Sequence, residues 1–502
     1  MWPADSASTS ILKPETIFEN PEPVSNCSID AARLKYQEAR RHHWNDVARK
    51  LQTWTGWGDD YHRRLTQIYQ SLVPPGQSVL ELGCAQGDLL AALRPASGIG
   101  VDFSEEMIRA AIRRHSHLRF VHADAHELKL TEKFDVIILS DLVNDLWDVQ
   151  TVFNNVSRLT TPRSRVIINC YSRLWEPVLK LAEWLKLSKP KLYQNWLTVE
   201  DITSLLNLAD CEVIKQSQDV LWPLPTLFVS NLCNRFLAKL WPFKHFALTN
   251  FIVARPRPRL APRRPSVSVI VPARNEAGNI PDIFARTPSM GEGTELVFVE
   301  GHSRDDTYAA IEKAVATHPE QSCQLLRQTG AGKGDAVRLG FAHAKGDMLM
   351  ILDADLTVPP EDLPRFYEAL VSGKGEFING VRLVYPMEKQ AMRFLNLVGN
   401  KFFSLAFSWL LGQSIKDTLC GTKVLWKKDY EAIASNRSYF GDFDPFGDFD
   451  LIFGAVKLNL KLIDLPIRYR ERTYGTTNIN RWTHGWLLLK MVVFAARRLK
   501  FV

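Results

Sequence analysis

Cysteine is scarce in this sequence, and so are export signals. The 502 residues include seven cysteines, an odd number with no C-x-x-C pair among them. This pattern provides neither a disulfide framework nor a zinc ribbon, and it suits a reducing compartment. Residues 1–30 contain several acidic residues and prolines, without the basic start and apolar stretch of a signal peptide. We therefore expect a cytoplasmic protein.

Long apolar runs are also lacking. No window reaches about 18 uninterrupted apolar residues, the length that a membrane-spanning helix requires. Residues 394–412 and 486–502 come near, but basic residues such as Lys401 and Lys490 interrupt them. Such helices can lie in a membrane interface or pack on a core. We favour the interface for 394–412, leave both open for 486–502, and predict peripheral contact at the cytoplasmic face of a membrane.

Neither sign of charge dominates the sequence. The net charge of +7 is mildly basic, and it fits anionic lipids, nucleotides or nucleic acids without choosing among them. Nucleic acid is not expected as a partner, because only this charge and an arginine-rich linker favour it.

The chain is longer than one hydrophobic core usually covers, which predicts two domains. Residues 254–266 contain five arginines and four prolines, a composition that favours an extended linker. We predict a flexible tail at 1–30, a first domain at 31–253 and a second at 267–502. Short β-rich runs alternate with helical stretches in both halves, which predicts α/β domains with parallel sheets. The predicted strands are 78–82, 98–102, 118–121, 134–139, 165–170 and 250–254, then 266–271, 296–299, 324–327, 348–352 and 377–381.

A glycine-bearing turn, ELGCAQG, follows the first predicted strand. Gly83 and Gly87 would let the backbone approach a cofactor closely. Asp102 ends the next predicted strand, where a carboxylate can accept hydrogen bonds from both ribose hydroxyls. A dinucleotide fingerprint would need glycine in place of Ala85 and Asp88, which disfavours a nicotinamide cofactor.

Over about residues 45–254 the sequence resembles class I S-adenosylmethionine-dependent methyltransferases. The resemblance rests on ELGCAQG, GVDFSEEMI, HADAHEL and FDVIILSDLVNDL, which occur in the family's order. It implies a Rossmann-like fold with S-adenosylmethionine as the cofactor. It also implies that the methionine end is bound by Glu81, Gly83, Ala85 and Gly87. The ribose would be bound by Asp102, and the adenine by Asp124 with Ala125.

Residues 140–143 bear on the methyl acceptor. They read Ser-Asp-Leu-Val and lack the Asn/Asp-Pro-Pro-aromatic cluster typical of enzymes that methylate the amino groups of nucleic-acid bases. An oxygen or carbon acceptor is therefore favoured.

Acidic residues also follow predicted strands in the second half. One strand runs into a polar loop with Glu276, and the next ends at Glu300. Asp353 and Asp355 come directly after the apolar run 348–352. A D-x-D pair at a strand end can coordinate a divalent cation, Mg or Mn, that neutralises the two phosphates of a nucleotide-sugar and lowers the barrier to their departure.

Over about residues 266–480 the sequence resembles glycosyltransferase family 2, which has a GT-A fold, and within it the dolichyl- or polyprenyl-phosphate sugar synthases. The resemblance rests on PARNEAGNI, VEGHSRDDT, GKGDAVRLGF, GDMLMILDADL, INGVR and DTLCGT. It implies inverting transfer from a nucleotide-sugar. The family's Asp-Asp-Gly-Ser is Glu300-Gly301-His302-Ser303 here, which leaves the nucleotide base open. The residues implied at the donor are Pro272, Ala273, Asn275, Glu276, Glu300, Lys333, Asp335, Asp353 and Asp355, the last two as catalytic residues that hold the metal.

The sugar acceptor can be a phosphate or a hydroxyl. A lipid phosphate is largely ionised at neutral pH and needs cations, whereas a hydroxyl needs a carboxylate base. Within FGDFDPFGDFD, Asp450 aligns best with the acidic residue of the family's acceptor loop and could be that catalytic base. We favour a polyprenyl-phosphate acceptor over another glycan or lipid. Its phosphate would contact Arg382, Lys423, Arg470, Arg472 and Arg481.

The two resemblances together predict a bifunctional enzyme that glycosylates and methylates within one glycolipid or polysaccharide pathway. The alternative is a glycosyltransferase whose methyltransferase-like domain is a non-catalytic scaffold.

Overall fold

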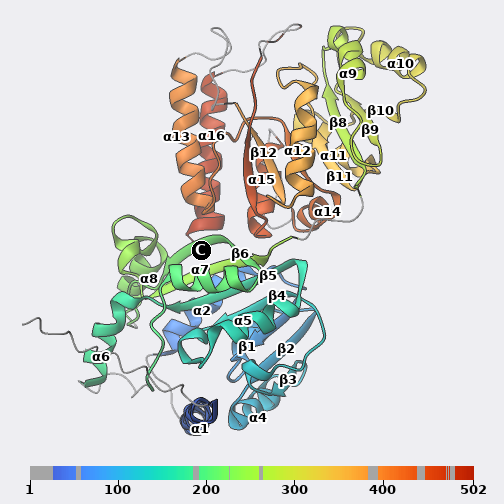
Figure 1. Ribbon diagram of the computed structural model, residues 1–502. Helices are drawn as coiled ribbons and strands as arrows, with labels where there is room; N and C mark the ends of the chain where they lie inside the picture. The colour runs from blue at the N-terminus through green and yellow to red at the C-terminus, as the bar shows by residue number, and fades with distance from the viewer. Residues whose placement is uncertain are drawn as a thin grey trace, which may run out of the picture.

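The computed structural model describes residues 26–51, 58–184, 192–224, 226–258, 264–382, 394–437, 447–470, 472, 474 and 481–501. Two α/β domains lie one above the other, the N-terminal domain in the lower half of Figure 1 and the C-terminal domain in the upper half.

The N-terminal domain alternates strands and helices as the sequence predicts. Its helices begin at residues that cap them: the side chains of Ser104, Asp148 and Thr198 each accept a hydrogen bond from an N–H group of the first turn. The strands are β1 (Ser78–Leu82), β2 (Ser97–Asp102), β3 (Arg119–His122), β4 (Phe134–Ser140), β5 (Thr160–Tyr171), β6 (Cys211–Asp219) and β7 (Thr249–Pro256). The helices are α1 (Asn26–Leu51), α2 (Gly58–Leu72), α3 (Asp88–Ala92), α4 (Glu105–Arg114), α5 (Val149–Arg158), α6 (Glu176–Trp184), α7 (Val199–Leu208) and α8 (Leu227–Arg235), with the short helices η1 (Ala125–Glu127) and η4 (Leu237–Lys239).

The sheet of this domain has the order β3-β2-β1-β4-β5-β7-β6. Neighbouring strands from β3 to β5 are parallel, as predicted. The prediction of a parallel sheet is wrong at β7, which runs antiparallel to both β5 and β6. β7 lies between β5 and β6 in the sheet, and it returns along β6 after α8, so the alternation of strands and helices does not give its direction. The carboxyl ends of β1, β2 and β4 meet at one edge, where ligands bind in such sheets.

The C-terminal domain has a second mixed sheet. Its order is β10-β9-β8-β11-β13-β12-β14, with β13 antiparallel to both neighbours. The strands are β8 (Val267–Ala273), β9 (Thr294–Glu300), β10 (Cys323–Arg327), β11 (Met348–Ile351), β12 (Phe377–Val381), β13 (Lys423–Trp426) and β14 (Leu462–Pro466). The helices are α9 (Ile280–Arg286), α10 (Thr307–Thr317), α11 (Lys333–His343), α12 (Leu363–Val371), α13 (Phe394–Leu411), α14 (Lys427–Ser435), α15 (Asp448–Lys457) and α16 (Arg481–Ala495), followed by η9 (Ala496–Lys500).

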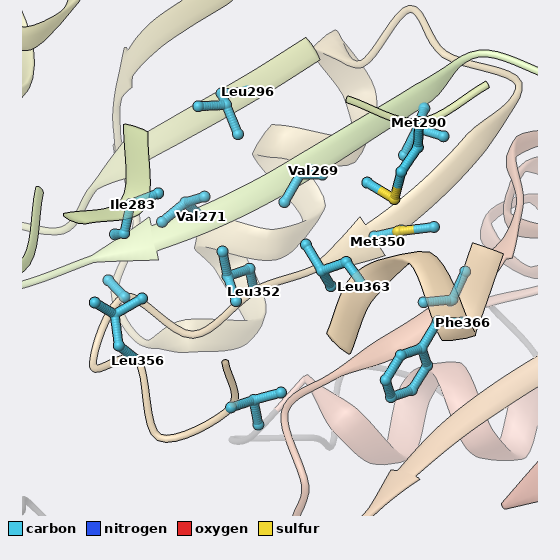
Figure 2. Packing of buried hydrophobic residues seen from close by; sticks show 14 of the residues in the cluster. Val269, Val271, Ile283, Met290, Leu296, Met350, Leu352, Leu356, Leu363 and Phe366 are labelled. Carbon is cyan, nitrogen blue, oxygen red and sulfur yellow. The ribbon is translucent and has the colours of Figure 1, made fainter. Parts of the chain in front are cut away.

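One face of this sheet is covered by α9 and α12. Val269 of β8, Leu296 of β9 and Met350 of β11 form one buried cluster with Leu363 and Phe366 of α12 (Figure 2). This core fixes β8 and β11, whose carboxyl ends carry most of the predicted donor residues.

Charged residues are buried where the two domains meet. Arg165 of β5 donates two hydrogen bonds to Glu376, at 2.8 and 2.9 Å, and Arg255 of β7 lies 3.2 Å from the same carboxylate. All three residues are at most 7% exposed. Asn459 also donates to the carbonyl of Leu72 at 2.7 Å. The domains are therefore joined by a network of buried ion pairs and hydrogen bonds.

The predicted domain boundaries fall close to these contacts. β7 contains residues 254–256 of the predicted linker, which makes Arg255 part of the interface. Residues 259–263 lie outside the described residues. Residues 26–30 of the predicted tail begin α1, and residues 1–25 lie outside the described ones.

The two apolar segments flagged in the sequence form α13 and the pair α16 and η9. The two helices stand side by side in Figure 1, and their inner faces contribute Phe407, Leu488 and Met491 to a buried cluster. Their other side chains include exposed apolar residues, namely Phe402, Leu405 and Trp409 of α13 and Trp486, Leu489 and Val493 of α16. Among the described helices, none has the length and apolarity needed to span a bilayer.

Candidate active sites

The turn after β1 has backbone angles that glycine adopts most readily. The angle φ is +72° at Gly83 and +78° at Gly87. A Cβ atom at Gly83 would lie 2.9 Å from Leu142, and one at Gly87 would lie 2.6 Å from Phe120. Both positions therefore require glycine for conformation and for space.

Asp102, at the end of β2, is held by this turn. Its two carboxylate oxygens accept hydrogen bonds from the N–H groups of Ala85 at 2.9 Å and Ser104 at 2.8 Å. Burial raises the pKa of this carboxyl, an effect that the two backbone hydrogen bonds oppose. The predicted ribose ligand and the predicted methionine-binding turn are thus in direct contact.

The helix α1 lies across this edge of the sheet. Gln37 donates to Asp124 at 2.7 Å, and Asn45 accepts a hydrogen bond from the Ser104 hydroxyl at 2.6 Å. Asp124 caps the start of η1 and is followed by the buried Ala125. Gln37 and Asn45 were not predicted, because a helix's position over distant strands is not encoded locally.

Glu81 of β1 lies just before the turn, and it is 2% exposed. Burial raises the pKa of its carboxyl to about 8. Its Oε2 atom has no hydrogen-bond partner among the described residues, and such an atom costs about 1–3 kcal/mol when buried. An ammonium group would satisfy this oxygen, and the methionine part of S-adenosylmethionine carries one. The residues at this edge therefore fit that cofactor.

A polar cluster at the ends of β4 and β5 was not predicted from the sequence. Asp141 directly follows β4 with a φ of +52°, and it accepts hydrogen bonds from Tyr61 at 3.0 Å and from Asn169 at 2.6 Å. Tyr69 in turn donates to Asn169 at 2.6 Å. The available signal was an acidic residue directly after an apolar strand, the same signal that identified Asp102.

In the C-terminal domain, the D-x-D pair lies at the end of β11. The ammonium of Lys333, the first residue of α11, is 2.5 Å from Asp353. Burial acts to raise the pKa of Asp353, but Lys333 and, beside it, Lys423 and Arg382 lower it below its ordinary value. Gly421 packs directly against this ion pair, since a Cβ atom there would collide with the Asp353 carboxylate and the Lys333 ammonium.

Asp355 is bound on both sides of its carboxylate. One oxygen accepts hydrogen bonds from the backbone and hydroxyl of Thr357, and the other is 2.6 Å from Arg472. Arg472 also lies 3.6 Å from Glu276. Burial raises the pKa of Glu276 to about 7, although Arg472 opposes this. Arg472 thus connects the D-x-D pair to the loop after β8.

The predicted nucleotide residues meet at the ends of β8 and β9. Pro272 and Ala273 end β8, where the Ala273 carbonyl accepts from Gly301 at 2.9 Å. Glu300 accepts from the Ser303 N–H at 2.5 Å, and Asn275 from the Arg304 N–H at 2.8 Å. Asp335 of α11 accepts hydrogen bonds from Gly330 at 3.2 Å and from Gln328 at 3.0 Å.

The predicted acceptor cations occupy different environments. Arg382 forms two hydrogen bonds with Asp417, at 2.7 and 2.9 Å, and Lys423 is fully buried 2.9 Å from Asp448. Arg470 is exposed, whereas Arg472 contacts Asp355 as described above. The side chain of Arg481 lies outside the described residues. Asp450, the predicted base, is buried on α15 with Arg437 at 2.8 Å.

Two family models match the chain, one in each domain. Residues 74–220 match a family described as a methyltransferase domain, and residues 268–433 match glycosyl transferase family 2. The chain is a fusion of these two transferase domains. The methyltransferase match runs from β1 to β6, and the glycosyltransferase match runs from β8 to α14. The predictions of a Rossmann-like fold, a GT-A fold and an enzyme of the transferase class are confirmed.

Named relatives match the glycosyltransferase domain. An undecaprenyl-phosphate 4-deoxy-4-formamido-L-arabinose transferase from Shewanella sediminis is 36% identical over 102 residues, 20% of this chain and 31% of that protein. Glycosyltransferase AglJ from Haloferax volcanii is 28% identical over 229 residues, 45% of this chain and 71% of that protein. The chain therefore spans about a third of the first relative's length and under three quarters of the second's.

A crystal structure of glucosyl-3-phosphoglycerate synthase from Mycobacterium tuberculosis, with Mn²⁺, UDP-glucose and phosphoglyceric acid, is also similar. Its sequence identity is 17% and its TM-score is 0.35, over 47% of this chain and 80% of that protein.

Proposed function

We propose that the glycosyltransferase domain transfers a sugar from a nucleotide-sugar to a polyprenyl-phosphate, and that the methyltransferase domain methylates a compound of the same pathway. The observation that carries the first half is the D-x-D pair at the end of β11, with Lys333 and Arg472 against its two carboxylates. The Glu81 oxygen beside the glycine turn, which has no hydrogen-bond partner among the described residues, supports the second half.

The donor site suits a metal-bound diphosphate. Asp353 and Asp355 would hold Mg or Mn through oxygen ligands, which such hard cations prefer. No group of three His, Cys, Asp or Glu side chains in the described part of the chain could hold a metal, so the diphosphate would complete the coordination. The bound ion would supply charge neutralisation of the leaving diphosphate. Lys333 and Arg472, each within 2.6 Å of one carboxylate, are placed to contact the same phosphates.

A phosphate acceptor agrees better with the charges than a hydroxyl acceptor does. An ionised phosphate needs no base, and among the predicted acceptor cations Arg470 is exposed and can contact it. Asp450, the candidate base for a hydroxyl, is buried and paired with Arg437. The relative named as an undecaprenyl-phosphate transferase supports the same choice.

For the methyltransferase domain, Glu81, Gly83, Ala85 and Gly87 would bind the methionine end of S-adenosylmethionine, and Asp102 the ribose. Asp124 and Ala125 would contact the adenine. The cofactor supplies a methyl group on a positively charged sulfur. The second candidate, a non-catalytic scaffold domain, would leave the Glu81 oxygen without a partner.

Asp102→Ala should weaken S-adenosylmethionine binding by about 1.5–3 kcal/mol, the usual worth of hydrogen bonds to a charged group. Titration calorimetry on the full chain measures this loss, and glycosyl transfer should stay nearly unchanged. Asp135→Ala is the matched control. Asp135 also accepts a backbone hydrogen bond, from Ser78 at 2.9 Å, but it lies at the opposite edge of the sheet. Equal affinity of both variants and the unmodified protein would disprove the ribose assignment.

The exposed apolar residues of α13 and α16 fit an interfacial contact with a membrane. Leu405 is 62% exposed and Val493 is 46% exposed, although other residues of the same helices are buried. Basic residues Lys401, Lys490, Arg497 and Arg498 lie on these helices and η9. We therefore place the protein at the cytoplasmic face of a membrane, where a polyprenyl-phosphate is accessible.

Leu405→Ser together with Val493→Ser should lower sedimentation with anionic liposomes at least about tenfold, since each change removes about 1–2 kcal/mol of apolar transfer free energy. High salt should lower the binding of the unmodified protein, because it screens the attraction between cations and headgroups. Ile112→Ser on α4, 51% exposed, is the control. If the unmodified protein fails to sediment with liposomes at low salt, the interfacial assignment is wrong.

A further inference from the structure

A cavity of about 300 Å³ lies in the methyltransferase domain between α2, the segment after β6 and α8. Tyr61, Arg63 and Arg64 line it from α2, and Trp222 and Arg235 line it from the other side. None of these residues belongs to the predicted cofactor site. The cavity is therefore separate from that site.

The charges around this cavity favour an anion. Arg64 and Lys239 both pair with Asp219, and Arg63 pairs with Asp60. Arg235 is exposed and donates to the Phe501 carbonyl at 3.0 Å. Among the described residues, three arginines and one aspartate line the cavity, which leaves an excess of positive charge. Arg63 is 69% exposed at its side chain, so it can reorient toward a bound phosphate.

The inner wall of the cavity touches the methyl-transfer region. The Tyr61 hydroxyl donates to Asp141 at 3.0 Å, at the carboxyl end of β4. The next residue, Leu142, packs on the glycine turn, because a Cβ atom at Gly83 would lie 2.9 Å from it. One hydrogen bond and one packing contact therefore connect the cavity to the predicted methionine end of the cofactor.

Exposed apolar residues of α8, here called the apolar rim, lie beside the polar residues that line the cavity and continue toward the other domain. Besides its cavity-lining residues, α8 exposes Phe228 and Leu232, which are 90% and 56% exposed. At its end, Phe236 contacts Phe501 with ring centroids 5.3 Å apart, and the Phe501 ring centroid lies 5.8 Å from that of Trp409 of α13. In Figure 1, α8 lies below the base of α13. An anionic headgroup in the cavity would thus place an attached lipid along this rim.

We infer that the cavity binds the methyl acceptor, a lipid phosphate that carries a sugar with a free hydroxyl, and that Asp141 is its base. The inference rests on the proposed function and names the acceptor class. The acceptor's hydroxyl oxygen forms a bond to the methyl carbon as the bond from that carbon to sulfur breaks. The hydroxyl proton passes to the Asp141 carboxylate, and the sulfonium becomes a neutral thioether. The products are a methyl ether and S-adenosylhomocysteine.

The site can be tested with farnesyl phosphate that carries a photoreactive benzophenone, incubated with the full chain. Peptides of α2 and α8 should be labelled, and unlabelled farnesyl phosphate should compete. Arg63→Gln with Arg235→Gln should lower this labelling at least fivefold, whereas Arg113→Gln, an exposed arginine of α4, should not. Labelling confined to the glycosyltransferase domain would overturn the inference.

Two competitors distinguish recognition of the phosphate from recognition of the lipid chain. Farnesol should compete poorly, because it lacks the charge, and inorganic phosphate should compete poorly, because it lacks the chain. Equal competition by farnesol would exclude the phosphate, and equal competition by inorganic phosphate would exclude the lipid. Calorimetry with S-adenosylmethionine on the same samples separates failure of the proposed methyl transfer from failure of the proposed acceptor site. Absence of cofactor binding overturns methyl transfer itself, whereas cofactor binding without cavity labelling overturns only this acceptor site.

Asp141 is tested separately with Asp141→Asn. This variant should keep its photolabelling and its affinity for S-adenosylmethionine, while incorporation of labelled methyl groups into glycolipid falls at least 100-fold. A parallel loss of labelling or of cofactor affinity would assign Asp141 a structural role only.

Discussion

Replacing Asp353 and Asp355 together with asparagine should lower sugar transfer by at least about two orders of magnitude, the usual effect of removing one main source of charge stabilisation. Asparagine keeps the shape of each side chain but removes two negative charges from an oxygen-rich site. Lys333 and Arg472, now 2.5 and 2.6 Å from these carboxylates, would lose these two ion pairs. Donor binding should lose its dependence on Mg or Mn, because the ion's protein ligands lose their charge.

Transfer of radiolabelled sugar from a nucleotide-sugar, measured over a range of Mn²⁺ concentrations, checks this result. Asp362→Asn is the matched control, since Asp362 pairs with Arg365 at 3.2 Å in the same domain but away from the strand ends. Methyl transfer should survive in both variants. Near-normal sugar transfer by the double variant would mean that the D-x-D pair is only an acidic turn, and the catalytic assignment would fail.

Glu376→Ala should lower the free energy of unfolding by about 3–5 kcal/mol, the cost of leaving buried charges without their partner. Glu376 accepts from Arg165 twice, lies 3.2 Å from Arg255 and also accepts from the Lys461 N–H at 2.9 Å. Both arginines are at most 5% exposed, so water cannot replace the lost carboxylate without opening the interface.

Urea unfolding followed by circular dichroism measures this change. Glu361→Ala is the control: Glu361 also forms two hydrogen bonds with an arginine, Arg286, but it is 54% exposed at its side chain. Its loss should cost less than about 1 kcal/mol, as is usual for surface ion pairs. Similar destabilisation by the two substitutions would show that the interdomain ion pairs contribute no more than surface contacts.

Features that depend on short stretches of sequence were predictable. The glycine turn, Asp102 and the D-x-D pair each follow an apolar strand, and in parallel sheets such positions share one edge. The sequence therefore identified these residues without knowledge of the strand order. Direct contacts such as that between Ala85 and Asp102 follow from the same geometry.

Features that depend on distant partners were not predictable. The pairing of β13 with β11 joins strands that are not adjacent in the chain, and α1 reaches Asp124 through Gln37 across 87 residues. Lys423 carried a signal for a cation, but only the fold shows that it is buried against Asp448. Tyr61 and Asp141 likewise meet across 80 residues.

The charged character of the interdomain contact bears on how the chain is synthesised. Glu376 follows Arg255 by 121 residues, an interval of about 6 to 24 s at roughly 5–20 residues per second on the ribosome. During that time the first domain can fold while Arg165 and Arg255 remain in water, which solvates guanidinium groups well. An apolar surface of similar extent would promote aggregation over the same interval. An interface of ion pairs thus lets the nascent methyltransferase domain stay soluble until its glycosyltransferase partner emerges.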